Sequence, residues 1–173
     1  MTDKSGAEGQ SDYVTMYTPS LLQSTPRKNQ RESLGITEES LPFKGLDIWN
    51  AYEFTWLDNK GKPEVAMAQF QFPGNSTNLI ESKSLKLYLG SYSGTKFGHR
   101  NEVISTLESD LTLAVRGQVS VSLMTPEQVQ HEGLGLLVGN SLDHLDVEIS
   151  DYHWNPEHLK LESNTIVRDS VFS

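Results

Sequence analysis

The alternation of apolar and polar residues predicts two neighbouring strands in the first half of the chain. Residues 48–57 form an aromatic-rich run, and residues 65–72 form a second run of strand-forming residues. Four side chains of the first run share one parity: Ile48, Tyr52, Phe54 and Trp56. The sequence between the runs, residues 58–63, is typical of a turn, and its Gly61 suits a positive φ. We therefore predict an antiparallel hairpin.

The pattern then changes to helical spacing. Residues 73–78 break the second strand and offer several N-cap residues. Leu85, Tyr88, Leu89 and Tyr92 are apolar residues at positions i, i+3, i+4 and i+7. This spacing predicts a helix over roughly residues 81–92, with Gly94 as the residue that stops it. A second helix is predicted over residues 102–116, with Gly117 as its stop. Its apolar stripe consists of Val103, Ile104, Leu107, Leu111 and Val115.

Two further alternating runs predict two more strands, each with one solvated face. Val119, Val121 and Leu123 alternate with polar residues in the first. The second run contains Leu145, Val147 and Ile149. The predicted order is strand, strand, helix, helix, strand, strand. Helices grouped between two strand pairs favour an α+β fold, with an antiparallel sheet and both helices on one face.

Composition divides the chain into four predicted parts. Residues 1–12 are rich in Gly, Ser, Asp and Glu, which is typical of a disordered tail. Residues 13–41 are predicted to be an extended N-terminal arm with little regular structure. The folded module is predicted to span residues 42–153, and residues 154–173 lack a strong period and are interpreted as a C-terminal connector.

Charge and composition narrow the class of protein. The formal net charge of −9 argues against direct binding of a nucleic acid, whose backbone attracts Lys and Arg. No apolar run approaches the roughly 20 residues of a membrane helix, and the first residues lack a signal peptide's apolar region. We therefore expect a soluble cytoplasmic protein with no membrane partner. The chain contains no cysteine, so it offers no thiol nucleophile.

Glu81, Ser82 and Lys83 are the main candidate site residues. They place a carboxylate, a hydroxyl and a cation side by side at a predicted helix start. The simpler interpretation is a charged first turn, where acidic residues are common. Lys83 and Lys86 weaken that interpretation, because cations near a helix N-terminus are mildly unfavourable. The group is therefore a candidate for binding a polar ring and an anionic cofactor.

Other polar groups are weaker candidates. The spacing of the five histidines does not favour a metal site, even for the nearest pair, His153 and His158. The glycine-rich residues 133–139 miss the dinucleotide-binding spacing and are predicted to form a loop or bulge. Residues 75–77 match a glycosylation acceptor but are more simply helix-capping residues. The basic residues within 27–31 suit a phosphate contact, a solvated arm or a pairing surface for the acidic body, and the last two are favoured.

The segment 78–89, Asn-Leu-Ile-Glu-Ser-Lys-Ser-Leu-Lys-Leu-Tyr-Leu, closely resembles the signature of NADPH-dependent 7-cyano-7-deazaguanine reductase. This family is the nitrile reductase of queuosine biosynthesis, a tRNA modification pathway. Shorter similarities to the N-terminal module of its long, two-module form lie at residues 20–23, 26–27, 34–35, 42–43, 47–49, 52–53, 56–57, 107–108, 110–111 and 119–121. The resemblance covers nearly all of the chain after the first dozen residues.

The resemblance implies the tunnelling fold (T-fold), which GTP cyclohydrolase I shares and which assembles into barrels. It implies reduction of the nitrile of 7-cyano-7-deazaguanine to an aminomethyl group by two NADPH, through a cysteine thioimide and with an aspartate assisting proton transfer. Ile80, Glu81 and Ser82 would contact the deazaguanine ring, and Ser82 and Lys83 would contact NADPH. Glu81 would accept hydrogen bonds from the amine and N–H edge of the ring.

The resemblance assigns the cysteine and the aspartate to a second module beyond the signature. It therefore implies that this chain contains no catalytic residue of its own and works with a C-terminal catalytic module, within a homo-oligomer. One alternative is a non-catalytic purine-binding or assembly module of the same fold. A metal hydrolase related by fold is a third and weaker interpretation, because the histidine spacing is poor.

Overall fold

The chain divides into two units, residues 1–130 and 131–173. The first unit contains an antiparallel sheet of three strands in the order β2-β3-β5: β2 (Leu46–Leu57), β3 (Pro63–Pro73) and β5 (Ser120–Met124). The division falls inside the predicted module 42–153. The structure is a computed structural model that describes residues 14–38, 40–132, 141, 143–153, 155 and 157. The two units are described separately.

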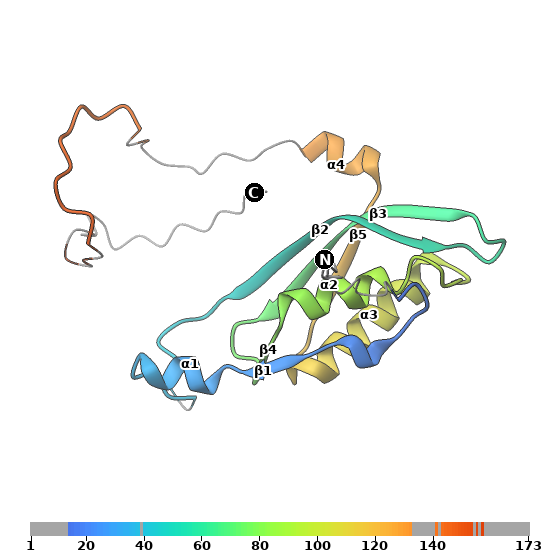
Figure 1. Ribbon diagram of the computed structural model, residues 1–173, viewed down its shortest axis with the longest axis horizontal. Helices are drawn as coiled ribbons and strands as arrows, with labels where there is room; N and C mark the ends of the chain where they lie inside the picture. Colours follow the sequence, from blue (N-terminus) through green and yellow to red (C-terminus); the bar gives the residue numbers. More distant parts are fainter. Residues whose placement is uncertain are drawn as a thin grey trace, which may run out of the picture. The chain divides into compact units, whose positions relative to one another are not determined.

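The predicted hairpin is confirmed. Strand β2 (Leu46–Leu57) pairs antiparallel with β3 (Pro63–Pro73), and β3 pairs antiparallel with β5 (Ser120–Met124) (Figure 1). In the turn, one oxygen of the Asp58 carboxylate accepts hydrogen bonds from the main-chain N–H groups of Lys60 and Lys62, each at 2.8 Å. Gly61 has a φ of +88°, the left-handed conformation that glycine adopts without steric cost.

The predicted parity of β2 is wrong over its first half. The pairing register shifts between Ala51 and Phe54, which marks a β-bulge. A bulge inserts one extra residue and so exchanges the two faces of the strand. Ile48 and Tyr52 are consequently 45% and 57% exposed, while Phe54 is buried. Trp49 packs against the core in place of Ile48.

Both predicted helices are present, and together with the sheet they give an α+β fold (Figure 1). Helix α2 spans Ser82–Gly90 and α3 spans Arg100–Val115. One core cluster joins both helices to the same sheet face: Phe54, Trp56, Ala66, Ala68, Phe70, Phe72, Ile80, Leu85, Tyr88, Tyr92, Phe97, Val103, Leu107, Leu111, Val115, Val119, Val121 and Leu123. Helix α2 ends at Gly90, earlier than predicted. Gly94 instead donates its N–H to the carbonyl oxygen of Thr15 at 2.8 Å.

The N-terminal arm contains more regular structure than predicted. A short 3₁₀ helix (Pro19–Leu21), strand β1 (Ser24–Pro26) and helix α1 (Lys28–Ser33) follow one another. Strand β1 pairs antiparallel with β4 (Asn78–Ile80), a three-residue strand directly before α2. No sequence pattern predicts this pairing, because neither segment is long enough to show an alternation.

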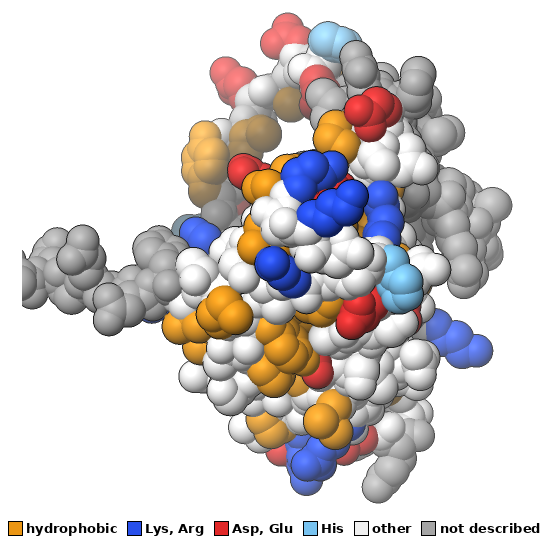
Figure 2. All heavy atoms as spheres, turned by 90° about the vertical axis from the view of Figure 1, so that its right-hand side faces the viewer, with side chains coloured by type: hydrophobic (Ala, Val, Ile, Leu, Met, Phe, Trp, Pro, Cys, Tyr) orange, Lys and Arg blue, Asp and Glu red, His pale blue; other side chains and the backbone are white. Residues whose placement is uncertain are grey.

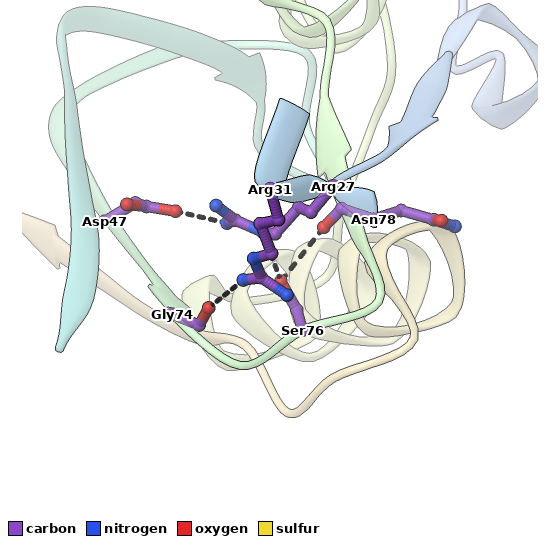
Figure 3. Close-up of polar contacts among 6 residues, drawn as sticks. All are labelled: Arg27, Arg31, Asp47, Gly74, Ser76 and Asn78. Carbon is purple, nitrogen blue, oxygen red and sulfur yellow. Dashed lines mark hydrogen bonds and ion pairs between the residues drawn. The ribbon is translucent and has the colours of Figure 1, made fainter. Parts of the chain in front are cut away.

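Two basic residues fasten the arm to the body (Figure 3). Arg27 forms an ion pair with Asp47 and donates from Nε to the hydroxyl oxygen of Ser76 at 3.1 Å. Arg31 is 8% exposed and donates to the carbonyl oxygen of Gly74. The interpretation as a pairing surface is therefore confirmed for Arg27, and the interpretation as a solvated arm is wrong for both arginines.

Ser76 is not a helix cap. Its side chain is 2% exposed and donates a hydrogen bond to the carbonyl oxygen of Asn78 at 2.9 Å (Figure 3). The turn that contains it leads into β4 and not directly into a helix. The prediction that residues 75–77 cap a helix is therefore wrong, and α2 is capped by Glu81.

The second unit lacks the strand predicted around residues 145–149. Leu145, Val147 and Ile149 are 58%, 62% and 64% exposed, and residues 145–150 have no regular secondary structure. Alternation alone does not make a strand when no neighbouring strand takes the hydrogen bonds. Helix α4 (Pro126–Glu132) lies at the boundary between the units. The predicted tail 1–12, the glycine-rich residues 133–139 and His158 lie outside the described residues.

In the part of the chain that the structure describes, no helix combines the length and the apolar character needed to cross a membrane.

We expect the close packing around Gly117 to require a glycine at this position. The left-handed residue at the end of α3 is Arg116, with a φ of 55°, so Gly117 is not the stop that the sequence predicted. A Cβ atom on Gly117 would lie 2.8 Å from the Cβ of Ser76 and 3.1 Å from the Cγ of Pro73. We expect Gly117→Ala to lower the free energy of unfolding by about 1–3 kcal/mol, because the crowded turn must move.

Gly90→Ala is the matched control, because a Cβ atom at Gly90 meets nothing within 4 Å and Gly90 is a helical residue. It should raise the free energy of unfolding by roughly 0.5–1 kcal/mol. Urea denaturation of both variants measures the difference. Equal effects of the two substitutions would contradict the packing role of Gly117.

Candidate functional site

Glu81 lies at the junction between β4 and α2 and caps the helix with its own side chain. It is extended, with φ −77° and ψ 128°, as N-cap residues are. Its two carboxylate oxygens accept from different main-chain N–H groups, Oε1 from Lys83 at 2.8 Å and Oε2 from Ser84 at 2.7 Å. The charged-first-turn interpretation therefore describes the observed geometry. The same geometry holds the carboxylate in one orientation.

Capping does not use up the carboxylate. An ionised carboxylate has about four lone-pair sites. Each Glu81 oxygen uses one of its two sites to accept a hydrogen bond from a main-chain N–H. Glu81 is half-buried, so its remaining acceptor sites are open to a further donor. A group of this kind, held in place and still able to accept, suits recognition of paired N–H donors on a planar ring.

The neighbouring candidates differ in exposure. Ser82 and Lys83 are exposed, and Ile80 is 2% exposed because its side chain belongs to the core. The 2% exposure includes its main chain, which pairs with Ser24 of β1, so Ile80 offers little accessible surface to a ligand. Among the described residues, Lys83 and Lys86 form no ion pair with a carboxylate, which leaves both ammonium groups available beside the N-terminal end of α2.

A cleft of about 650 Å³ lies between α2, β2 and the arm. Its apolar wall includes Trp49, Phe54 and Phe70, and its polar groups include Ser82 and Lys86. Glu81, Lys83 and Ile80 are not among its lining residues. Of the predicted site residues, the structure therefore brings Ser82 into the cleft and leaves Glu81 beside it, one residue away.

A cluster of phenols holds the arm against the helices. Asp110 accepts hydrogen bonds from the hydroxyls of Tyr17 and Tyr88, both at 2.6 Å to Oδ2. The Tyr88 hydroxyl also lies 2.6 Å from that of Tyr92. Burial, the largest cause, raises the pKa of Tyr17, Tyr88 and Tyr92 far above the ordinary value, and the Asp110 charge raises it further.

The sequence offered only part of this cluster. Tyr88 and Tyr92 belong to the predicted apolar stripe, whereas no sequence pattern singles out Asp110. The contact with Tyr17 spans 93 residues of sequence and leaves no local pattern. The cluster also supports the cleft, because Val14 and Thr15 of the same arm line it.

The described histidines do not gather into a metal site. His99 caps α3, where its Nδ1 accepts from the N–H of Glu102 at 3.2 Å. His153 contacts Asp151. In the described part of the chain, no group of three or more His, Asp or Glu side chains is placed to hold a metal ion.

On the face shown in Figure 2, Lys and Arg side chains are interspersed with Asp and Glu.

A comparison with known families bears on the identity of the chain. A family model described as nitrile reductase, 7-cyano-7-deazaguanine-reductase, N-terminal, matches residues 13–123. The matched region contains the arm, the hairpin, β4, both long helices and most of β5. It also contains Ile80, Glu81, Ser82 and Lys83.

Proposed function

The chain belongs to the 7-cyano-7-deazaguanine reductase family of nitrile reductases, as an N-terminal module, and from this premise we propose that it binds 7-cyano-7-deazaguanine and NADPH for reduction of the nitrile. Membership confirms the family resemblance and places the chain in the queuosine pathway. The proposal concerns what this module itself contributes to the reaction.

The orientation of the Glu81 carboxylate is the observation that carries the proposal. Two main-chain N–H groups fix it beside the cleft before any ligand arrives. Such a carboxylate accepts hydrogen bonds from the exocyclic amine and the ring N–H without first paying to become ordered. Ser82 contributes a hydroxyl at the cleft, and the buried Ile80 holds the main chain directly before Glu81 in place.

NADPH is proposed to lie near Ser82 and Lys83. Helix α2 presents the positive end of its dipole there, and Lys83 adds a cation, both of which favour a phosphate group. NADPH supplies hydride when bound. The residues of this chain bind and orient, and the thiol that attacks the nitrile comes from a second module, because the chain contains no cysteine.

The antiparallel hairpin with two helices on one sheet face supports a tunnelling fold. That fold and the family together support a homo-oligomer.

The test is to mix the chain with NADPH and 7-cyano-7-deazaguanine. We expect binding of the deazaguanine by calorimetry and no steady loss of nicotinamide absorbance. Steady oxidation should begin when a catalytic module of the family is added. Clear oxidation by this chain alone would contradict the proposed need for a second module.

The absence of cysteine also favours a second candidate, a non-catalytic purine-binding or assembly module. This candidate predicts that added catalytic module produces no turnover. Within it, calorimetry separates the two roles: purine binding gives a heat signal with the deazaguanine, and pure assembly gives none.

Lys83→Ala is expected to weaken NADPH binding about tenfold at low salt, since one charge-assisted contact to phosphate is lost. Lys60→Ala is the control, because Lys60 is an exposed lysine of the β2–β3 turn, distant in sequence from α2. Fluorescence titration of NADPH measures both variants. An equal loss in the two would show that general surface charge, and not Lys83, attracts the cofactor.

A further inference from the structure

Ser84 is a buried residue that contacts Glu81 in two ways. Ser84 is only 3% exposed. Its main-chain N–H donates to Oε2 of Glu81 at 2.7 Å, and its hydroxyl donates to the main-chain carbonyl oxygen of Glu81, also at 2.7 Å. Ser84 therefore holds both the carboxylate and the backbone of the proposed ring-binding residue.

The same hydroxyl connects Glu81 to the arm. It accepts from the N–H of Gln23 at 3.0 Å, and the carbonyl oxygen of Gln23 lies 3.3 Å away as a second acceptor. That carbonyl oxygen also accepts from the N–H of Glu81 at 2.9 Å. Directly beside these contacts, β1 pairs with β4 through Ser24 and Ile80. Gln23, Glu81 and Ser84 thus form one closed network that joins the arm, β4 and α2.

We propose that Ser84 is a positioning residue for ligand recognition, and that the arm at Gln23 is part of the same device. The inference rests on the proposed function of Glu81. Ser84 does not lie among the cleft residues, so it acts through Glu81. Without its hydroxyl, the Gln23 N–H loses its acceptor, and the Glu81 carbonyl oxygen keeps only the Leu85 N–H at 3.0 Å. The main chain of Glu81 is then held less firmly, so its carboxylate is less well oriented toward the ring.

Ser84→Ala tests the inference because it removes the hydroxyl and keeps the main-chain N–H that caps α2. Affinity is measured by calorimetry for 7-cyano-7-deazaguanine and for its analogue without the exocyclic amine. In Ser84→Ala, the preference for the amine-bearing ligand should fall about tenfold, because only that ligand uses the full Glu81 contact. Ser84→Thr keeps the hydroxyl and should restore part of the preference. A merely structural role would weaken both ligands equally, and that result would overturn the inference.

Gln23 gives an independent test from the arm side. Gln23→Pro removes the N–H group that donates a hydrogen bond to the hydroxyl oxygen of Ser84. The preceding residue, Leu22, has φ −65° and ψ 126°, a conformation that suits a residue before proline. Gln23→Ala is the control, because the side chain of Gln23 is exposed and only its main chain makes these contacts. The proline variant should reproduce the Ser84→Ala loss and the alanine variant should not. Full ligand preference in the proline variant would overturn the role of the arm.

A measurement without ligand completes the test. Hydrogen exchange of the Lys83 amide, which donates to Glu81 Oε1, should become several-fold faster in Ser84→Ala, while amides within α3 keep the wild-type rate. Unchanged exchange at Lys83 would overturn the inference. If wild type prefers the amine-bearing ligand through Glu81 and Ser84→Ala keeps that preference, this inference fails alone. If wild type binds neither ligand, the proposed function fails and the positioning role fails with it.

Discussion

Glu81→Asp is expected to lower the affinity for 7-cyano-7-deazaguanine by about 100-fold or more while leaving the stability of the chain nearly unchanged. Asp is among the best N-cap residues, so the shorter carboxylate still accepts from the first turn of α2. It is one methylene shorter and withdraws from the ring. Two hydrogen bonds to a charged group carry roughly 1.5–3 kcal/mol each, and losing most of that accounts for a 100-fold change.

Glu81→Ala separates the two roles of the side chain. It should lose ligand binding to the same degree and also lower the free energy of unfolding by about 1 kcal/mol, because the Lys83 and Ser84 N–H groups lose their cap. Calorimetry measures binding, and urea denaturation measures stability. The aspartate variant is thus the control for folding and the alanine variant is the control for capping.

Glu53→Gln is the matched control for charge, because Glu53 is a second, exposed carboxylate that lines the cleft. It should change the affinity less than about threefold, as rim charges commonly do. If Glu53→Gln abolishes binding while Glu81→Asp retains it, the ring lies at the other side of the cleft and the assignment of Glu81 is wrong.

Local sequence patterns predict some features of this chain and not others. The stripe of α3 was readable because Val103, Leu107 and Leu111 recur at helical spacing and all three are fully buried. The face of β2 was not readable, because the bulge after Ala51 reverses the parity without a glycine or proline to mark it. The prediction of a strand at 145–149 is wrong, because alternation shows which side chains would share one face of a strand and not whether a neighbouring strand is present to pair with it.

The candidate site shows the same limit. The residue types at 81–83 marked the place, and the structure shows that Glu81 caps α2 while Ser82 enters the cleft. The supports of the site come from the arm, about 60 residues earlier, through Gln23 and Ser84. Long-range contacts between single main-chain groups leave no periodicity, so no pattern in one sequence predicts them.

A second large effect is expected at high pH. The free energy of unfolding should fall by at least about 3 kcal/mol for each pH unit above pH 10, because the two fully buried phenols each contribute about 1.4 kcal/mol per unit. The half-buried Tyr17, whose pKa is also raised by burial, adds a smaller amount. Burial raises the pKa of Tyr88 and Tyr92 in the folded chain above the ordinary value of about 10 that applies when the chain unfolds. The folded state therefore keeps protons that the unfolded state releases. This contribution is complete below pH 10 and is lost as the pH rises toward the folded-state pKa values.

Guanidinium denaturation at pH 9, 10 and 11 measures this dependence, with tyrosinate absorbance near 295 nm as a second signal. Tyr88→Phe removes one of the two phenols and should roughly halve the slope, so comparison with wild type cancels the titration of lysines. Asp110→Asn should lower stability at neutral pH, since both phenol hydrogen bonds lose a charged acceptor, yet keep most of the slope, because burial is the largest cause of the raised pKa of Tyr88. A flat stability between pH 9 and 11, or an unchanged slope in Tyr88→Phe, would show that these phenols are reached by water in the folded chain. The arm that Tyr17 fastens to Asp110 would then be only loosely held against α2, and the wall that Val14 and Thr15 give to the cleft would open with it.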